Sequence, residues 1–466
     1  MIRNVSIHGL RGFGEKRTIS FAIPQEGVKG SGLTILVGSN NSGKTTILEA
    51  IRSFNCSQNE PPSFAERKRN IKCENGTIHL KLETEESTYT IDTVESGGST
   101  TEIKKDNEVD GAWETPRTFI LQSRRFAEYE FHRSYMERRD YIQNQQMQID
   151  NRTASIYEFN ARLFKMQKNK EQFNILLKRV LGYDLEWTIE KNENGTFYLK
   201  FIINGCVHSS EGLGDGIWSV FTICDALYDS EEGSTIAIDE PELSLHPAYQ
   251  KKIMELFNEF SQDRQIIIST HSPYFVDVTA ITNGANLYRT VKNYEGNIDV
   301  FMLSDESKRE LKGFLNNFNQ PHTLGTEAKE IFFLEDRIII TEGQEDVIMY
   351  KRAAENVGTC IYGTFFGWGA GGASNIQKIA TILNDLGYKK VSAVFDGDKP
   401  EEKLLFQEKF PEYQCLIISA PDIRDKKAVN KEAKEGVLTA GGILKEQYRE
   451  EMRNLFMEIN SFFQEN

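Results

Sequence analysis

The stretch L-V-G-S-N-N-S-G-K-T-T-I-L-E, from Leu36 to Glu49, decides how the first half of the chain folds. It overlaps the apolar run Leu33 to Val37 and leads into a segment with the spacing of an amphipathic helix. A strand, a glycine loop and a helix in this order form a phosphate-binding loop, because the glycines let successive backbone N–H groups turn toward phosphate oxygens. The helix N-terminus adds partial positive charge at the same point. The motif therefore predicts a nucleoside triphosphate site, against the alternative of a glycine turn without a ligand.

The loop also carries the side chains that a bound triphosphate requires. Lys44 is expected to reach the β- and γ-phosphates, and the hydroxyl of Thr45 is expected to bind the accompanying Mg²⁺. The predicted cofactors are therefore ATP and Mg²⁺, with Mn²⁺ as an alternative metal. The residues predicted to bind them are Gly38, Asn40, Asn41, Ser42, Gly43, Lys44, Thr45 and Thr46.

Composition is typical of a globular protein of the reducing cytoplasm. The 466 residues are enough for roughly two to four domains. No apolar run approaches the ~18 residues of a membrane span, and the first residues, M-I-R-N-V-S-I-H, do not resemble a signal peptide. The six cysteines are scattered without a C-x-x-C pair, which argues against a zinc site or a disulfide framework. We therefore expect a cytoplasmic protein that does not bind a membrane.

The net charge and the local charge distribution give opposite indications about nucleic-acid binding. The formal net charge of −14 disfavours DNA as a partner, but the local distribution of charge decides phosphate contact. Between Arg117 and Arg179 there are 13 Lys and Arg residues against 7 Asp and Glu residues, a local excess of 6. Much of this region, from about 127 to 182, is predicted to be a helical insertion. It is either a surface for the DNA backbone or a set of solvated helix faces.

Two continuous apolar runs later in the chain predict buried strands that end in polar residues. T-I-A-I-D-E-P-E-L-S-L-H-P ends its strand at Asp239 and Glu240, and Q-I-I-I-S-T-H-S-P ends its strand at His271. Carboxylates that close an apolar run are costly without a partner. We expect Asp239 to contact Mg²⁺, Glu240 to polarise the attacking water and His271 to sense or stabilise the γ-phosphate. Gln122, after the run P-R-T-F-I-L, is a candidate to connect Mg²⁺ and water with the helical region.

Four motifs resemble, in their order, those of ABC-type ATPases of the SMC and RecF kind: G-S-N-N-S-G-K-T, S-S-E-G-L-G-D-G, I-A-I-D-E-P-E-L-S-L-H-P and S-T-H-S-P. In that family the serine–glycine signature of one subunit completes the nucleotide site of the other. The resemblance therefore implies a head-to-head homodimer with two composite sites, to which Ser210 and Gly212 contribute in trans. The signature departs from the usual L-S-G-G-Q form. Roughly 170 residues separate it from the phosphate loop, too few for the long coiled coil of SMC proteins.

The C-terminal third contains a second set of acids at predicted strand ends. R-I-I-I-T-E-G-Q-E-D ends a buried strand at Glu342, V-S-A-V-F-D-G-D-K-P ends another at Asp396-x-Asp398, and C-L-I-I-S-A leads to Asp422. Such carboxylates converge on one crevice, where they repel one another unless a divalent cation is bound. Asp346 lies four residues after Glu342, within reach of a second metal. Two metals so held could activate water and stabilise the leaving oxygen in phosphodiester cleavage, whereas structural carboxylates are the alternative.

Residues from about 336 to 466 resemble the Toprim domain of topoisomerases, primases and small nucleases. An ABC-type ATPase followed by Toprim resembles the OLD (overcoming lysogenization defect) family of ATP-dependent nucleases. This resemblance implies that the metal ligands are Glu342, Asp346, Asp396 and Asp398, with Asp422 as a further candidate. It also implies a catalytic lysine, which is either Lys427 or Lys426 in P-D-I-R-D-K-K-A. The loop G-W-G-A-G-G-A-S-N, from Gly367 to Asn375, is either a DNA-phosphate site or a plain strand-to-helix turn.

The predicted architecture is therefore α/β throughout. Residues 1–325 are expected to form an ABC-type P-loop ATPase head with the helical insertion, and residues 326–466 a Rossmann-like Toprim domain with a parallel sheet. The predicted function is an ATP-hydrolysing, Mg²⁺-dependent DNA endonuclease whose Toprim site is regulated by an ATPase dimer or higher oligomer. Relatives with this architecture act in bacterial defence against phage, sometimes with a partner protein or nucleic acid. The alternatives are an ATP-driven sensor or scaffold that docks an effector, and a RecF-like repair ATPase that leaves the C-terminal acids unused.

Overall fold

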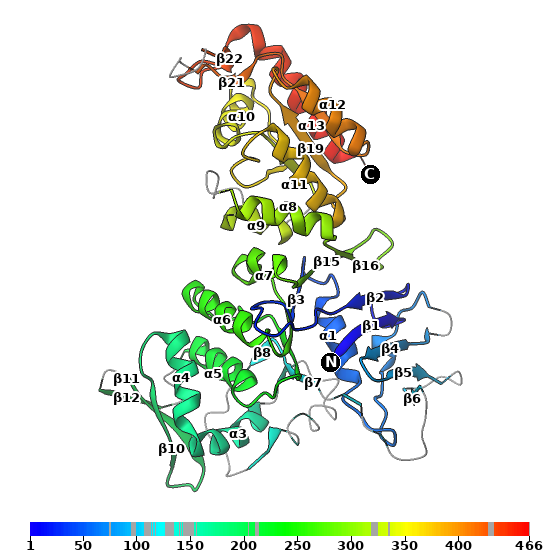
Figure 1. Ribbon diagram of the computed structural model, residues 1–466, viewed down its shortest axis with the longest axis vertical. Coiled ribbons are helices and arrows are strands. Elements are labelled where there is room, and N and C mark those ends of the chain that lie inside the picture. Colours follow the sequence, from blue (N-terminus) through cyan, green and yellow to red (C-terminus); the bar gives the residue numbers. More distant parts are fainter. Residues whose placement is uncertain are drawn as a thin grey trace. The chain divides into compact units, whose positions relative to one another are not determined.

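In a computed structural model of the protein (Figure 1), the chain divides between residues 300 and 301 into an N-terminal unit and a C-terminal unit. The residues that the structure describes are 1–73, 76–94, 99–106, 113, 115–116, 118–125, 135–138, 140, 142, 153–154, 156–203, 205–209, 214–317, 325–333, 336–426 and 433–465. Within these ranges, no helix combines the length and the apolar character needed to cross a membrane.

The N-terminal unit is built on a six-stranded sheet with the strand order β16-β15-β3-β14-β13-β7. Its strands are β3 (Leu33–Gly38), β7 (Thr118–Leu121), β13 (Thr235–Asp239), β14 (Gln265–Ser269), β15 (Asn286–Lys292) and β16 (Ile298–Met302). β3, β13 and β14 are buried at every position and run parallel, as expected of continuous apolar runs in a sheet covered on both faces. Helix α1 (Lys44–Ser53) follows β3 after the glycine loop. The predicted strand, loop and helix are therefore confirmed.

An antiparallel sheet with the order β2-β1-β4-β5-β6 lies against the opposite side of α1. Its strands are β1 (Ile2–His8), β2 (Arg17–Ser20), β4 (His79–Thr84), β5 (Thr88–Thr93) and β6 (Thr101–Lys105). Side chains of this sheet, of α1 and of β3 form one apolar core, to which Ile7, Ile47 and Leu36 belong. The buried side chain of Gln265 connects the two sheets, because its amide accepts from the N–H of Ile2 (3.1 Å) and donates to the carbonyl of Ile2 (2.7 Å).

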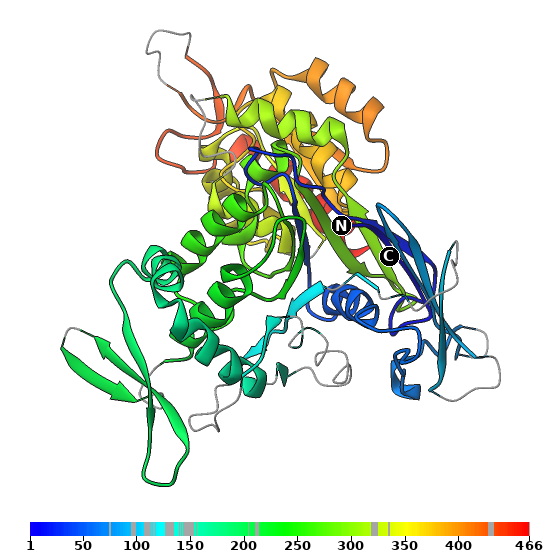
Figure 2. The same ribbon diagram turned by 60° about the horizontal axis from the view of Figure 1, so that its bottom comes forward.

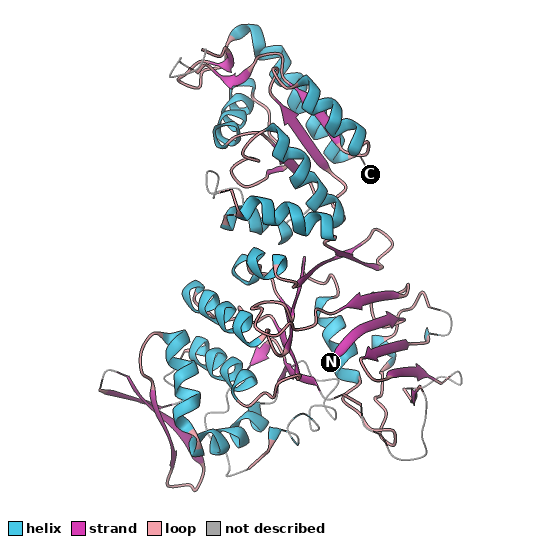
Figure 3. Cartoon of the chain, in the orientation of Figure 1, coloured by secondary structure: helices cyan, strands magenta, loops and turns pink. Residues whose placement is uncertain are grey.

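Five further α-helices belong to the described part of the N-terminal unit (Figures 1 and 3). They are α3 (Ile156–Lys168), α4 (Lys170–Leu181), α5 (Asp215–Tyr228), α6 (Pro247–Phe260) and α7 (Val278–Thr282). Within the predicted helical insertion the structure has the helices α3 and α4, which follow the short parallel strands β8 (Arg124–Arg125) and β9 (Thr153–Ala154). Much of the chain between β8 and β9 lies outside the described residues. The antiparallel strands β10 (Glu186–Lys191), β11 (Phe197–Ile203) and β12 (Cys206–Ser209) form a small sheet at one edge of this unit (Figure 2).

The C-terminal unit contains a four-stranded parallel sheet with the order β18-β17-β19-β20. Its strands are β17 (Ile338–Ile340), β18 (Thr364–Phe365), β19 (Val391–Phe395) and β20 (Gln414–Ile417), and a separate parallel pair is β21 (Asp422–Arg424) with β22 (Gly436–Leu438). Its helices are α8 (Asp305–Leu315), α9 (Thr326–Glu330), α10 (Gln344–Val357), α11 (Ala373–Asp385), α12 (Pro400–Lys409) and α13 (Arg449–Gln464). The expected parallel sheet is therefore present.

Helices cover both faces of this parallel sheet, as neighbouring residues of β19 show. Val394 belongs to an apolar core with side chains of α10 and α13, whereas the ring of Phe395 contacts Phe406 of α12 (5.7 Å between centroids). Because successive strand residues point to opposite faces, these helices lie on opposite sides of the sheet. The chain leaves β17 toward β18 on one side and then crosses to β19 on the other. The C-terminal ends of β17 and β19 are thus the switch point of the sheet, where open α/β sheets bind ligands.

The stretch after Ser304 begins with α8 in the C-terminal unit. Asp385 at the end of α11 accepts hydrogen bonds from the hydroxyls of Ser304 and Ser307 and from the N–H of Ser304 (2.9 Å). These bonds attach the N-terminus of α8 to α11, which explains why the boundary between the units precedes α8. The assignment of residues 1–325 and 326–466 to two functional domains stays a prediction.

Candidate functional site

The phosphate-binding loop has the backbone that its glycines permit. Gly38 has φ 143°, Asn41 has φ 63° and Gly43 has φ 101°, all in the region that favours glycine. A Cβ atom on Gly38 would lie 2.3 Å from the carbonyl oxygen of Thr290 in β15, so this position excludes any larger residue. The buried Lys44 donates from Nζ to the carbonyls of Gly38 and Ser39, at 2.9 Å each. The lysine therefore spans the loop in the place where a triphosphate would compete for its ammonium group.

The two acids predicted at the end of β13 lie beside this loop. The hydroxyl of Thr45 donates to Oδ2 of Asp239 at 3.1 Å, and the hydroxyl of Ser269 in β14 donates to Oδ1 of Asp239. Glu240 follows with φ 46°, and Nε2 of His271 lies 3.9 Å from its Oε1. A hydroxyl and a carboxylate in contact are the oxygen ligands that Mg²⁺ prefers beside nucleotide phosphates. The donor set therefore fits Mg²⁺, while the individual roles stay predictions.

Two cavities meet at Thr45 and Glu240. One, of about 330 Å³, is lined by Asn40 through Thr46 together with Glu240 and His271, and also by Arg11 and Lys292. The second, of about 230 Å³, is lined by Gln122 together with Thr45, Asp239 and Glu240. Gln122 thus lines a cavity together with both acids and Thr45, and β8 begins two residues after it. Its role as a link to the helical region stays a prediction.

Electrostatics in the first cavity favour an anionic ligand. Burial lowers the pKa of Lys44 to about 8, although the nearby carboxylates of Glu240 and Asp239 oppose this shift. Burial, with the charge of Lys44, lowers the pKa of His271 to about 4. His271 is therefore neutral at physiological pH and can act toward phosphate as a hydrogen-bond donor without net charge. A bound phosphate would raise the pKa of Lys44 again, because its negative charge favours the protonated ammonium group.

Glu242 is a residue of this site that the sequence did not single out. Its partly buried carboxylate accepts from the backbone N–H of His271 (2.5 Å) and from the hydroxyl of Thr270 (2.8 Å). Burial raises the pKa of Glu242, and the hydrogen bonds from His271 and Thr270 oppose that shift. The carboxylate holds the backbone at the end of β14 and so orients His271. The only sequence signal was its place in D-E-P-E, two residues after Glu240.

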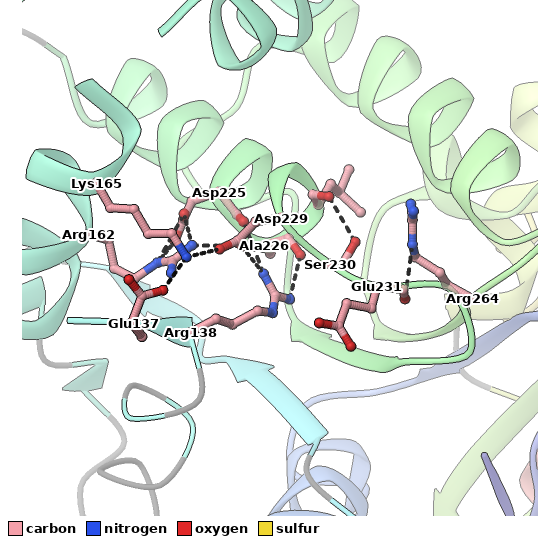
Figure 4. Close-up of polar contacts among 11 residues, drawn as sticks. Glu137, Arg138, Arg162, Lys165, Asp225, Ala226, Asp229, Ser230, Glu231 and Arg264 are labelled. Carbon is pink, nitrogen blue, oxygen red and sulfur yellow. Dashed lines mark hydrogen bonds and ion pairs between the residues drawn. The ribbon is translucent and has the colours of Figure 1, made fainter. Parts of the chain in front are cut away.

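The predicted signature residues Ser210 and Gly212 lie outside the described residues. The helix that follows them, α5, is held at its C-terminal end by ion pairs to the helical region (Figure 4). Arg162 of α3 has a fully buried side chain and donates to Asp225 (2.8 Å) and Asp229 (2.7 Å). Arg138 donates to Asp229 (2.5 Å) and to the carbonyl of Ala226 (2.9 Å). Cations from the region after β8 therefore fix the helix that carries the signature.

In the C-terminal unit the predicted acids gather at the switch point of the parallel sheet. Glu342 follows β17 and accepts from the backbone N–H of Asp396, after β19, at 3.2 Å. Asp346 in the first turn of α10 accepts from the N–H of Gly343 at 2.7 Å. Asp396, Asp346 and Asp422 are more than nine-tenths buried, and Asp398 is about one-third exposed. The structure therefore places these carboxylates after the ends of β17 and β19, at the start of β21 and in the first turn of α10.

These carboxylates interact strongly with one another. Burial and the charges of Asp346, Glu342 and Asp422 raise the pKa of Asp396 to about 8. Burial, opposed by the bond from Gly343 and reinforced by Asp422, raises the pKa of Asp346 to about 6, and burial raises the pKa of Glu342 as well. The group thus lacks positive charge, and its hard oxygen donors fit a divalent cation.

Two lysines partly neutralise the carboxylates of this group. Lys426, one of the two predicted lysines, pairs with Asp422 (2.5 Å), and Lys434 pairs with Asp398 (2.5 Å). Lys427 lies outside the described residues, and Lys434 was missed because 36 residues separate it from Asp398. Over the part of the chain that the structure describes, no three His, Cys, Asp or Glu side chains stand close enough together to hold a metal. A bound cation would therefore require the carboxylates to turn toward one another.

The glycine loop before α11 supports the strand that carries Glu342. The N–H groups of Gly371 (2.7 Å) and Gly372 (2.9 Å) both donate to the carbonyl of Glu342. Gly369 has φ 84°, and a Cβ atom there would lie 2.4 Å from the carbonyl oxygen of Gly343. These contacts favour the structural interpretation of this loop, since two of its N–H groups bind the protein itself.

Two family models match the N-terminal unit. Residues 4–208 match a model described as "AAA domain", and residues 207–277 match one described as "AAA domain, putative AbiEii toxin, Type IV TA system". The first match contains the phosphate-binding loop, and the second contains Asp239, Glu240 and His271. The N-terminal unit therefore contains an ATP-binding AAA-type ATPase domain, which implies ATP hydrolysis.

Two curated proteins show partial sequence similarity. The Septu protein PtuA of Bacillus thuringiensis is 24% identical over 295 residues, which is 54% of this chain and 68% of that protein. The OLD nuclease of Thermus scotoductus is 33% identical over 118 residues, 25% of this chain and 22% of that protein. The chain is thus a distant homologue of both, and the aligned part spans less than a quarter of the nuclease.

Solved structures of SMC heads show a distant likeness. The SMC head domain of Thermotoga maritima is 14% identical with a TM-score of 0.37, over 65% of this chain and 99% of that one. An SMC head with an extended coiled coil, derived from Pyrococcus furiosus and bound to the C-terminal domain of ScpA, is 14% identical with a TM-score of 0.41. This second match covers 68% of this chain and 99% of that one.

Proposed function

We propose that this chain is an ATP-regulated, metal-dependent DNA endonuclease whose phosphodiester chemistry takes place at the acids of the C-terminal unit. One observation carries the proposal: at the switch point of a parallel sheet, the charges of Asp346, Glu342 and Asp422 act on the buried Asp396 and help to raise its pKa to about 8. The resemblance of the sequence to OLD nucleases and the partial similarity to one of them support it.

The acids and Lys434 would have different roles in this site. Glu342, Asp346, Asp396 and Asp398 would hold divalent cations, which when bound supply activation of water and charge neutralisation at a phosphodiester. Lys434 is placed by its pair with Asp398 at the exposed rim, where a DNA phosphate could replace the carboxylate as its partner. Asp346, Asp396 and Asp422 are buried, whereas the pair of Lys434 with Asp398 is partly exposed to solvent.

The N-terminal unit would regulate this site as a homodimer. Its resemblance to SMC- and RecF-like ATPases supports two composite ATP sites, with Ser210 and Gly212 acting across the interface. A role in bacterial defence against phage, with DNA as substrate and a partner protein or nucleic acid as trigger, is part of the proposal. The resemblance to OLD nucleases and the similarity to PtuA support it.

The test is cleavage of supercoiled plasmid by the full chain with Mg²⁺ or Mn²⁺, with and without ATP. We expect Glu342→Gln and Asp396→Asn to abolish cleavage while ATP hydrolysis continues. Glu435→Gln is the matched control, because Glu435 is an exposed acid of the same unit. Lys44→Ala should cut more than the wild type if nucleotide restrains the nuclease, and less if ATP drives it. Cleavage that survives both acid substitutions would refute the proposed site.

A second function has a specific observation in its favour. Lys426 and Lys434 neutralise Asp422 and Asp398 directly, and no metal-binding group is assembled among the described residues. The C-terminal unit could then be a docking module of an ATP-driven sensor, and its acids would be structural. A wild-type chain that hydrolyses ATP, binds a partner and cuts no DNA with either metal would support this alternative.

A further inference from the structure

Tyr350 has an unexplained hydroxyl next to the acids of the C-terminal unit. The residue lies on α10, one helical turn after Asp346, so both side chains are on the same face of the helix. Its side chain is only 2% exposed, and its hydroxyl has no hydrogen-bond partner among the described residues. A buried hydroxyl without a partner is unfavourable, and such groups are uncommon in folded proteins.

The aromatic ring of Tyr350 is held firmly by apolar neighbours. It stacks on Phe365 with 6.4 Å between centroids and meets Phe456 of α13 edge-on at 6.5 Å. All three residues belong to the apolar core between α10, α13 and the sheet. Phenylalanine would satisfy this packing equally well. The packing therefore explains the ring and leaves the hydroxyl without a structural purpose.

The surroundings of the hydroxyl are acidic. The carboxylates of Asp396, Asp346, Glu342 and Asp422 all act on it, with Asp396 the strongest of these charges. Burial is the first cause that raises the pKa of Tyr350 well above 10, and these charges raise it further. The hydroxyl therefore keeps its proton and can donate a hydrogen bond in this acidic environment. None of them accepts its hydrogen bond in the present arrangement of the group.

We propose that Tyr350 is a positioning residue, whose hydroxyl donates a hydrogen bond to Asp396 when a divalent cation draws the acids together. This inference rests on the proposed function of the same site. The bond would hold the carboxylate of Asp396 in one orientation toward the cation. Partners of this kind outside the direct ligands fix the geometry of metal sites.

The test is Mn²⁺ binding to the nucleotide-free full chain after removal of metals, measured from free Mn²⁺ by electron paramagnetic resonance. Tyr350→Phe should weaken the Asp396-dependent site about 10- to 100-fold. The matched control is Tyr413→Phe, which removes a buried tyrosine hydroxyl of the same unit that already donates to the carbonyl of Tyr388 (2.8 Å). This control should leave Mn²⁺ affinity unchanged. In an Asp396→Asn background, Tyr350→Phe should have no further effect.

The melting temperatures of the metal-free variants give a second measurement, which distinguishes a positioning role of Tyr350 from a structural one. Tyr350→Phe should melt at or above the wild-type temperature, because it removes an unpartnered hydroxyl, whereas Tyr413→Phe should melt below it. Failure of Tyr350→Phe to fold, or unchanged Mn²⁺ affinity, would overturn the inference. If the wild type itself has no Asp396-dependent Mn²⁺ site, the proposed function fails instead.

Discussion

Replacing Arg162 by methionine tests how the helical region holds the signature helix. The guanidinium of Arg162 is fully buried and makes three hydrogen bonds to Asp225, from Nη2 (2.8 Å) and from Nε (3.2 and 3.3 Å), and one to Asp229 (2.7 Å). Asp229 keeps Arg138 and Lys165 as partners when Arg162 is removed. Asp225, whose side chain is 2% exposed, has no second ion pair among the described residues. The substitution therefore leaves a carboxylate buried without a cation.

The expected loss of stability follows from the fact that Asp225 loses its ion-pair partner whereas Asp229 keeps two. Removing one partner of a buried ion pair destabilises a protein by about 3–5 kcal/mol, whereas replacing both by apolar residues is often neutral. At about 1.4 kcal/mol for each factor of ten, this cost is roughly a 100- to 4,000-fold rise in the population of the opened state. Arg162→Met should show the full rise in the population of the opened state. The double variant Arg162→Met with Asp225→Leu should return this population to near the wild-type level.

Hydrogen exchange of the amides in α5, followed by mass spectrometry of its peptides, measures this opening locally. Local exchange is preferable to whole-chain melting, because the chain has two units and does not unfold in a single step. The exposed pair of Arg179 with Glu259 in the same unit offers a control, since Arg179→Met should change exchange only slightly. A rise of less than about tenfold for Arg162→Met, or a double variant as labile as the single one, would refute the reasoning.

Three further predictions concern the two candidate sites. Glu240→Gln should lower ATP turnover by about 100- to 10,000-fold while a fluorescent ATP analogue still binds, and equal turnover in phosphate-release assays would contradict its role as base. Gly369→Ala should destabilise the C-terminal unit by more than about 2 kcal/mol in urea unfolding, because φ 84° and the backbone of Gly343 oppose a side chain. Gly441→Ala, with no atom closer than 3.8 Å, should not. In metal-free protein, stability should fall as pH rises from about 4 to about 8, because the folded pKa of Asp396 exceeds the unfolded value. Unfolding of Asp396→Asn across that range should show a smaller slope.

Much of the fold could be predicted from local patterns. The largely apolar runs predicted β3, β13, β14 and β19 correctly, since a strand covered on both faces is buried at every position. The acids at the strand ends could also be predicted, because a carboxylate that follows an apolar run lies where the chain leaves the sheet. The strand order was not predictable in this way, since it depends on pairings far apart in the chain.

The site residues that were missed share a different cause. Glu242 and Lys434 act through contacts that no short motif encodes. Glu242 binds the backbone of a neighbouring strand, and Lys434 pairs with an acid 36 residues away. Tyr350 has its proposed role only because α10 places it one turn after Asp346. The choice between Lys426 and Lys427 rested on a motif alone, and the structure adds Lys434, which no motif indicated, to the lysines that pair with these acids.

The connection of Ile2 to Gln265 has a consequence for biosynthesis. These partners are 263 residues apart, and β3 itself pairs with β14 and β15, which end at Ser269 and Lys292. The nucleotide-binding loop therefore cannot reach its final form until the ribosome has released well over half of the chain. Until then β3 exposes an apolar strand with two unpaired edges, which favours aggregation. Expression should accordingly depend on chaperones, and fragments that stop before β15 should be insoluble.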